Sequence, residues 1–347
     1  LGQKASILVK WGNGGPILAL SEKVITMRYW LLLLSSFLVN SVYGQTCCSG
    51  GVPVSGNLGM PAGEVGLMQV SIAYDQNRLN TLQTEWTRQE DANRTRLTHS
   101  ALVELGYVWS KRWAVDVLGA FVVQERLIQT QNGGEDLART VGIGDLTTLL
   151  KFSPILPKPG QSFDWQLGFG VKAPLGATDR AGSNGISYNL DLQPGSGAWD
   201  ALLWSRASFA PWQRASSQLF VQGVFSRKGV FREYFGVQAY QFGAEYQLLA
   251  GWSDRFLLGP WIFDPQLTLR WRSALEDRVD TAILPNTGGD WLFVIPGFML
   301  WPQPNWALQA SLELPTLARV TGTQLTPTYR LQIGFFYRLQ TQSTINP

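Results

Sequence analysis

Segments of about ten residues in which apolar and polar side chains alternate one by one recur along the chain from residue 65 onward. Successive side chains of a β-strand point to opposite faces, so a period of two indicates strands with one apolar and one polar face. The clearest example is 163–172, where aromatic and aliphatic residues alternate with polar residues and glycines. The same pattern occurs at 240–248 (with Tyr240 and Phe242 on the apolar face), 263–272, 306–314 and 329–339. The pattern predicts an all-β fold.

Alternation by itself fits two all-β architectures. In a soluble sandwich the apolar faces meet in a shared core, whereas in a transmembrane barrel they contact lipid and the polar faces line the lumen. On either architecture the strands are expected near 65–75, 98–109, 113–126, 143–153, 163–174, 198–209, 217–227, 239–249, 261–272, 289–300, 306–314 and 328–339.

The lengths of the connections favour the barrel. Outer-membrane barrels alternate short periplasmic turns with longer extracellular loops, and an even number of strands returns both chain ends to the periplasm. The odd connections run over 76–97, 127–142, 175–197, 228–238, 273–288 and 315–327, and the even ones, mostly shorter, over 110–112, 154–162, 210–216, 250–260 and 301–305. We therefore expect a transmembrane antiparallel β-barrel of about 12 strands in a bacterial outer membrane, with short periplasmic turns and long extracellular loops.

The positions of the tryptophans point the same way. The chain contains 15 tryptophans but only 15% charged residues, and many of these tryptophans flank the even turns. Amphipathic rings concentrate at membrane–water interfaces, although tryptophan also marks strand ends in other β proteins. We expect an aromatic girdle at one rim made of Trp109, Trp113, Trp165, Trp212, Trp252, Trp261, Trp301 and Trp306.

The first part of the chain has the pattern of an export signal. Met27-Arg28 precedes an apolar run from Tyr29 to Val39 and a small-residue exit that ends at Gly44. The run is about half the length of a membrane-spanning helix, so a signal peptide is favoured over an anchor. We expect 1–26 to be an upstream extension, 27–44 the signal peptide, 45–63 a periplasmic or plug segment, 64–340 the barrel and 341–347 a tail.

The cysteines are adjacent, at Cys47 and Cys48, and so cannot close a loop that would stabilise the fold. A lipidated amino terminus, a strained vicinal disulfide and a soft-metal ligand pair are the functional alternatives to a purely local structural role. Gly44-Gln45-Thr46 lacks the residues usual before a lipidated cysteine, and two thiolates with the single histidine, His99, make an incomplete zinc site. Copper(I) accepts fewer soft ligands and stays open. We favour the local role and expect no cofactor.

Residues able to carry catalysis or nucleic-acid binding are scarce. Ser100 follows His99 directly, so on a strand the two point to opposite faces and cannot form a hydrolytic pair. The net charge is only +3 and the cations are scattered, which argues against a nucleic-acid partner. We therefore expect no enzyme, and we expect the inward-facing charges to balance one another across the lumen. These lumen-lining residues are Asp116, Lys151, Asp164, Lys172, Glu245, Arg270, Arg272, Glu313 and Arg330.

Several glycine-rich turns carry a resemblance to a known family. The sequences Gly142-Ile143-Gly144-Asp145, Lys151-Phe152, 168–176 and Pro194-Gly195-Ser196-Gly197-Ala198-Trp199-Asp200 resemble the outer-membrane proteins grouped under the MetA pathway of phenol degradation. The resemblance is strongest over 140–210, and Leu175 departs from it, standing where the family usually has threonine. It implies passage of hydrophobic or aromatic small molecules. The final alternating segment, 329–339, also resembles the terminal strand recognised by the barrel assembly machinery.

The expected interior suits small solutes. Twelve strands should enclose a narrow, partly filled lumen, and several inward positions are apolar: Leu102, Val108, Leu118, Val122, Leu202, Trp204, Phe220 and Phe336. We expect a passive outer-membrane channel for small hydrophobic or aromatic solutes, in contact with membrane lipid. A structural or accessory membrane protein is the first alternative and an outer-membrane enzyme the second.

Overall fold

The computed structural model describes residues 64–90, 93–129, 134–156, 163–211, 214 and 216–341. Within these ranges the chain is all β apart from one short 3-10 helix, η1 (Leu190–Leu192). No helix in this part of the chain is long and apolar enough to cross a bilayer. The expected signal peptide, the 45–63 segment and both cysteines lie outside the described residues.

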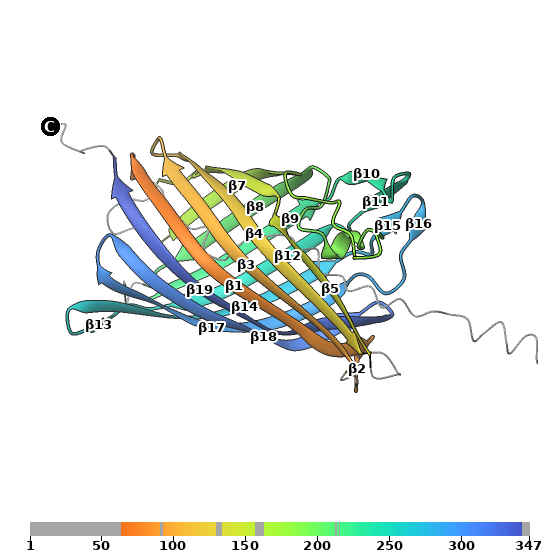
Figure 1. Ribbon diagram of the computed structural model, residues 1–347. Helices are drawn as coiled ribbons and strands as arrows, with labels where there is room; N and C mark the ends of the chain where they lie inside the picture. Colours follow the sequence, from red (N-terminus) through yellow and green to blue (C-terminus); the bar gives the residue numbers. More distant parts are fainter. Residues whose placement is uncertain are drawn as a thin grey trace, which may run out of the picture. The chain divides into compact units, whose positions relative to one another are not determined.

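Twelve antiparallel strands close into a barrel, which confirms the predicted fold class (Figure 1). Each strand pairs with the next along the chain, and β1 pairs with β19 from Leu67↔Gln340 to Thr84↔Thr323 to complete the circle. The strands are β1 (Leu67–Thr84), β3 (Arg94–Val108), β4 (Trp113–Gln129), β5 (Glu135–Ile143) continued by β6 (Leu146–Phe152), β7 (Phe163–Ala173), β8 (Asp200–Phe209), β9 (Gln218–Arg227), β12 (Glu245–Ser253), β14 (Trp261–Ala274), β17 (Gly289–Gln303), β18 (Trp306–Val320) and β19 (Thr323–Gln340).

The outer face of the barrel is apolar and the inner face polar, the reverse of a soluble protein. On β7 the side chains of Leu167 and Phe169 are exposed, whereas Gln166 and Lys172 are buried. Closure satisfies the backbone hydrogen bonds of every strand, so the exposed side chains can meet lipid without an unpaired sheet edge. The alternation in the sequence therefore records the two faces of a transmembrane wall.

Three of the expected long loops are instead mostly strand. In the expected loop 127–142, β4 continues to Gln129 and β5 begins at Glu135. β1 and β3 extend across most of 76–97, with the short strand β2 (Thr87–Gln89) pairing back on β1. β18 and β19 extend across most of 315–327 and leave only Thr321 and Gly322 between them, where Gly322 has a φ of +70°. Polar residues interrupt the apolar face of these extensions, and strands that continue beyond the lipid need no such face, so the hydrophobic pattern did not reveal them.

A second, four-stranded sheet lies at one end of the barrel. It contains β10 (Val230–Tyr234), β11 (Gln238–Gln241), β15 (Arg278–Val279) and β16 (Ala282–Ile283). Figure 1 shows these strands gathered at the end opposite the short strand β13 (Phe256–Leu258). We call this end the loop end, and the opposite end, where β1 begins and β19 finishes, the terminal end.

The expected strand 239–249 is wrong in its first part. Tyr240 and Phe242 belong to β11 and the residues just after it, and they are buried against Leu190 and Tyr234 instead of facing lipid. The barrel strand begins at Glu245. Alternation runs unbroken through both strands, so the sequence pattern does not mark the boundary between them.

A buried carboxyl group secures this end. Asp277 accepts hydrogen bonds from the Tyr240 hydroxyl at 2.7 Å and from the Gly243 backbone N–H at 2.8 Å. Burial raises the pKa of Asp277 above its usual range, against the opposing effect of these two hydrogen bonds. The carboxyl therefore ties β11 to the segment that follows β14.

Candidate functional site

The nine charged residues expected to line the lumen all lie on inward faces of barrel strands. The side chains of Asp116, Lys151, Lys172, Glu245, Arg270 and Glu313 are buried, and those of Asp164, Arg272 and Arg330 are half-buried. Burial of so many charges needs compensation, because an unpaired charge in a water-poor interior is costly.

Ion pairs supply that compensation around most of the barrel wall. Arg330 contacts Asp75 at 2.7 Å, Arg270 contacts Glu313 at 2.5 Å, and Arg272 contacts Glu245 at 3.0 Å. At β7 and β8, Lys172 lies 2.8 Å from Asp200 and 3.0 Å from Asp145. Lys228 lies 3.5 Å from Asp200. We call these residues the charged belt: Asp75, Asp145, Lys172, Asp200, Lys228, Glu245, Arg270, Arg272, Glu313 and Arg330. Its cations and carboxylates are equal in number.

Three residues of this belt were not among those predicted from the sequence to line the lumen: Asp75, Asp145 and Lys228. Asp75 lies on the same face of β1 as Ser71 and Ala73, so strand parity could have identified it. Asp145 lies in the break between β5 and β6, and Lys228 follows the end of β9, where strand parity no longer applies. Their contacts across the lumen depend on the closed barrel.

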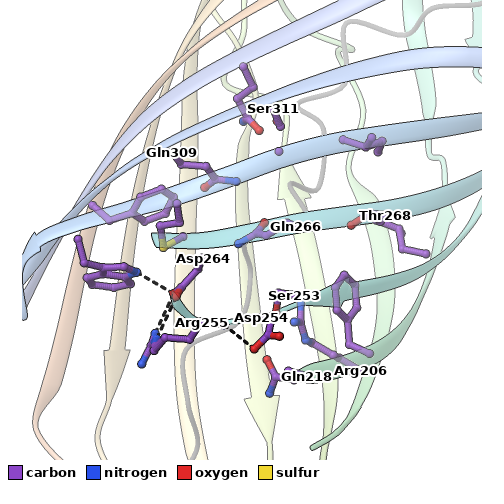
Figure 2. Close-up of a pocket in the computed structure, with 18 of the residues that line it drawn as sticks. Arg206, Gln218, Ser253, Asp254, Arg255, Asp264, Gln266, Thr268, Gln309 and Ser311 are labelled. Atoms are coloured by element: carbon purple, nitrogen blue, oxygen red, sulfur yellow. Dashed lines mark hydrogen bonds and ion pairs between the residues drawn. The ribbon is translucent and has the colours of Figure 1, made fainter. Parts of the chain in front are cut away.

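Two interior cavities lined by described residues meet at the charged belt. The larger cavity, part of whose lining is drawn in Figure 2, has a volume of about 440 Å³. It extends toward the terminal end, where Ser216, Asp254 and Arg255 line it. The smaller cavity, of about 110 Å³, lies nearer the loop end. Arg270, Glu313 and Arg330 line both cavities, so these three side chains form the boundary that a solute would have to pass.

The larger cavity is lined by polar groups from several strands. Asp264, Gln266 and Thr268 follow one another at alternate positions of β14, and Gln309 and Ser311 project from β18 (Figure 2). Arg255 forms a bidentate contact with the Asp264 carboxylate, at 2.9 and 2.8 Å. The same carboxylate accepts a hydrogen bond from the Trp301 indole N–H at 3.0 Å. Aromatic surface is contributed by Phe220, Trp301 and Phe336.

The connection between β7 and β8 folds into the barrel. Within this inner loop, 174–199, the residues from Leu190 to Ser196 are buried. Arg96, 1% exposed, contacts the Asp191 carboxylate at 3.0 Å, and the Gln124 amide donates to the Gln193 carbonyl at 3.1 Å. The inner loop thus lies inside the lumen against the inward faces of β3 and β4.

A single carboxylate joins the start of the inner loop to the end of its buried part. Asp145 accepts hydrogen bonds from the backbone N–H of Gly176 at 3.1 Å and from the hydroxyl of Ser196 at 2.6 Å. Gly176 and Gly195 approach so closely that a Cβ on either would overlap the backbone of the other. This explains the glycines of the sequence motif. A long loop was predicted at 175–197, but nothing in the sequence pattern showed that this loop turns inward.

Four of the eight apolar inward residues pack into two clusters inside the barrel. Leu102, Leu118 and Val122 form one cluster with two alanines, and Trp204 forms another with Leu149 and Val224. A Cβ added to Gly168 would lie 3.0 Å from the Leu149 side chain, so this part of the interior is filled. Of the other apolar inward residues, Leu202 lines the smaller cavity, Val108 packs on Leu67, and Phe220 and Phe336 line the larger cavity.

The tryptophans at the terminal end are mostly on the outer surface. Exposed indoles are those of Trp109, Trp113, Trp165, Trp252 and Trp261; Trp306 is half-buried, and Trp212 lies outside the described residues. The assignment of Trp301 to this girdle is wrong, because its side chain is only 6% exposed and faces the lumen. Strand parity on β17 places Trp301 on the same inward face as Trp291 and Phe293, although it lies close to a turn.

The candidate hydrolytic residues do not form a catalytic site. His99 lies on the outer face of β3, where its Nδ1 is 2.6 Å from the Tyr74 hydroxyl. Ser100 is buried on the opposite face. Among the described residues, no group of three or more His, Cys, Asp or Glu side chains could hold a metal ion.

No family model and no curated protein matches the sequence. Among solved structures, an outer membrane channel from Pseudomonas putida F1 is similar, with a TM-score of 0.61, 13% identity and coverage of 82% of this chain and 99% of that chain. The chain has the fold of an outer-membrane β-barrel. The β domain of the Bordetella autotransporter BrkA is less similar, with a TM-score of 0.45, 12% identity and coverage of 79% and 100%.

Proposed function

We propose that this chain is a passive channel of a bacterial outer membrane for small hydrophobic or aromatic solutes. The observation that carries the proposal is the cavity of about 440 Å³ inside a closed barrel with an apolar outer face. Small-molecule sites typically occupy about 300–1,000 Å³. The cavity is therefore of a size to hold a single-ring molecule, and the barrel wall separates it from lipid.

The sequence resemblance supports the aromatic part of the proposal. Residues that carry the resemblance to the phenol-degradation transporters also build the interior: Asp145 and Ser196 secure the inner loop, and Lys172 belongs to the charged belt. The larger cavity adds the rings of Trp301 and Phe336. We infer that the chain is a member of that family.

The orientation follows from the topology. With twelve strands, both ends of the barrel segment reach the terminal end, which we assign to the periplasm, and the loop end to the outside. The last strand, β19, lies between β1 and β18, and we propose it as the segment that the barrel assembly machinery recognises. The exposed tryptophans of the terminal end would then form the periplasmic girdle.

Flux measurements on the purified, folded barrel test the function. In liposomes it should raise permeability to small aromatic solutes, and in planar bilayers it should conduct ions. A heat-modifiable, folded barrel with neither flux nor conductance would contradict the proposal and favour a structural or accessory role. Lipid cleavage that is lost when His99 is changed would instead favour an enzyme.

A further inference from the structure

We propose that the larger cavity binds single-ring aromatic carboxylates, so that the preferred solute is an aromatic anion instead of a neutral hydrocarbon. The proposal rests on the proposed channel function and names its substrate class. It is based on the charges, the aromatic rings and the hydrogen-bonding groups that line this one cavity.

The lining of the larger cavity is richer in cations than in anions. Its guanidinium groups belong to Arg206, Arg255, Arg270, Arg330 and Arg338, and its carboxylates to Asp254, Asp264 and Glu313. Two ion pairs cross the edge of the lining, Asp254 with Arg214 and Arg330 with Asp75, each at 2.7 Å, and together they leave the excess of cations unchanged. A narrow cavity with low-dielectric walls concentrates the field of its lining charges, so this excess favours an anionic guest.

Arg338 is the guanidinium best placed to receive a carboxylate. Its Nε donates to the neutral Gln69 amide oxygen at 3.1 Å, and among the described residues it forms no ion pair. Its remaining N–H donors lie in the plane of the guanidinium, which is the geometry that recognises a carboxylate in bidentate fashion. The other lining arginines Arg255, Arg270 and Arg330 each contact a carboxylate already.

Aromatic rings lie directly beside these cations. The Arg338 guanidinium lies 4.7 Å from the centre of the Trp301 ring, and that of Arg206 lies 4.1 Å from the centre of Phe220. Stacking engages the flat face of a guanidinium and leaves its in-plane N–H donors directed elsewhere. Phe336 packs against Trp301 and also lines the cavity. Ring and cation together match a molecule that carries a ring and a carboxylate.

The rest of the lining can distinguish substituents on the ring. Gln218, Gln266, Thr268 and Gln309 present amide and hydroxyl groups to the same space (Figure 2). Such groups donate to and accept from ring hydroxyls. Toward the loop end, Arg270 and Arg330 line both cavities, so a carboxylate leaving Arg338 meets further guanidinium groups along the lumen.

Calorimetric titration of the full, detergent-folded chain with benzoate, phenol and cyclohexanecarboxylate tests the proposal. Benzoate should bind, and phenol and cyclohexanecarboxylate should each bind more weakly, because one lacks the charge and the other the aromatic face. Arg338→Gln should weaken benzoate binding about tenfold or more, the effect of losing a charged hydrogen bond. Arg338→Lys, which keeps the charge but loses the planar donors, should recover only part of the affinity.

Arg232→Gln is the matched control, because it removes the same charge at an exposed site on β10, outside the lining. It should leave benzoate binding unchanged. Equal weakening by Arg232→Gln and Arg338→Gln, or equal binding of all three probes, would overturn the proposal. If Arg338→Gln fails to give a heat-modifiable barrel, Arg206→Gln replaces it with the same expected loss.

Benzoate binding and channel conductance can fail independently, so the two measurements distinguish the carboxylate site from the channel function. A barrel that conducts ions and passes phenol but binds no benzoate overturns the carboxylate site and leaves the channel standing. A barrel that binds benzoate in detergent but conducts nothing in bilayers keeps the site and overturns the channel. Absence of both overturns both.

Discussion

At the scale of single residues, the outer face of β7 tests the contact with lipid. Phe169 lies near the middle of this strand with its side chain 55% exposed. Arginine near the bilayer midplane of a barrel costs about 2–4 kcal/mol. Phe169→Arg should therefore lower the free energy of unfolding by about that amount, measured by urea unfolding of the barrel in lipid vesicles.

Phe169→Leu is the control for that substitution. It removes the ring but leaves an apolar side chain, so the unfolding free energy should change far less than with arginine. Gly223→Ala supplies a second reference on an outward face, since no atom lies within 4 Å of an added Cβ there. Equal losses for Phe169→Leu and Phe169→Arg would argue against a lipid-facing position.

At the scale of elements, the inner loop decides how much of the lumen is open. Asp145 anchors the loop through hydrogen bonds with Gly176 and Ser196. Its ion-pair partner, Lys172, would still pair with Asp200 if Asp145 were removed. Asp145→Ala should therefore loosen the loop without leaving an unpaired cation. We expect higher single-channel conductance in planar bilayers and faster proteolysis within 178–189.

Asp179→Ala is the matched control for the inner loop. Asp179 is an exposed carboxylate of the same loop, so its removal changes the charge equally without removing an anchor. Conductance and proteolysis should match those of the unaltered chain. The same conductance in both variants would show that the inner loop does not limit passage.

At the scale of the whole molecule, the boundary between the two cavities should set charge selectivity. Arg270 and Glu313 are 2.5 Å apart and both line the two cavities. Arg270→Gln removes a cation from this boundary and should shift the reversal potential in a salt gradient toward cation preference. Glu313→Gln removes the anion and should shift it toward anion preference.

The opposite signs of these two shifts are the critical result. Both substitutions break the same ion pair, so a general loosening of the barrel would move the reversal potential in the same direction in both variants. Shifts in the same direction would therefore show that the Arg270–Glu313 pair does not line the conducting path. The heat-modifiable mobility of each variant in detergent gels shows whether its barrel is closed.

The sequence by itself determined the barrel wall. Period two along each strand is a local property, because neighbouring side chains of a strand must point to opposite faces. Segment 163–172 therefore corresponds closely to β7, and Lys172 was assigned to the inward face that the structure shows. An even number of strands and an apolar outward face followed from the same pattern.

Only the tertiary structure decided what lies inside that wall. The pairing of Lys172 with Asp145 and Asp200, the lumen-facing position of Trp301 and the burial of Tyr240 against Leu190 join residues that are far apart in the sequence or lie where strand parity breaks. The inner loop is polar and glycine-rich, a composition equally suited to a solvated loop. It turns inward because the closed barrel presents buried partners such as Arg96 and Asp145, which local sequence patterns do not encode.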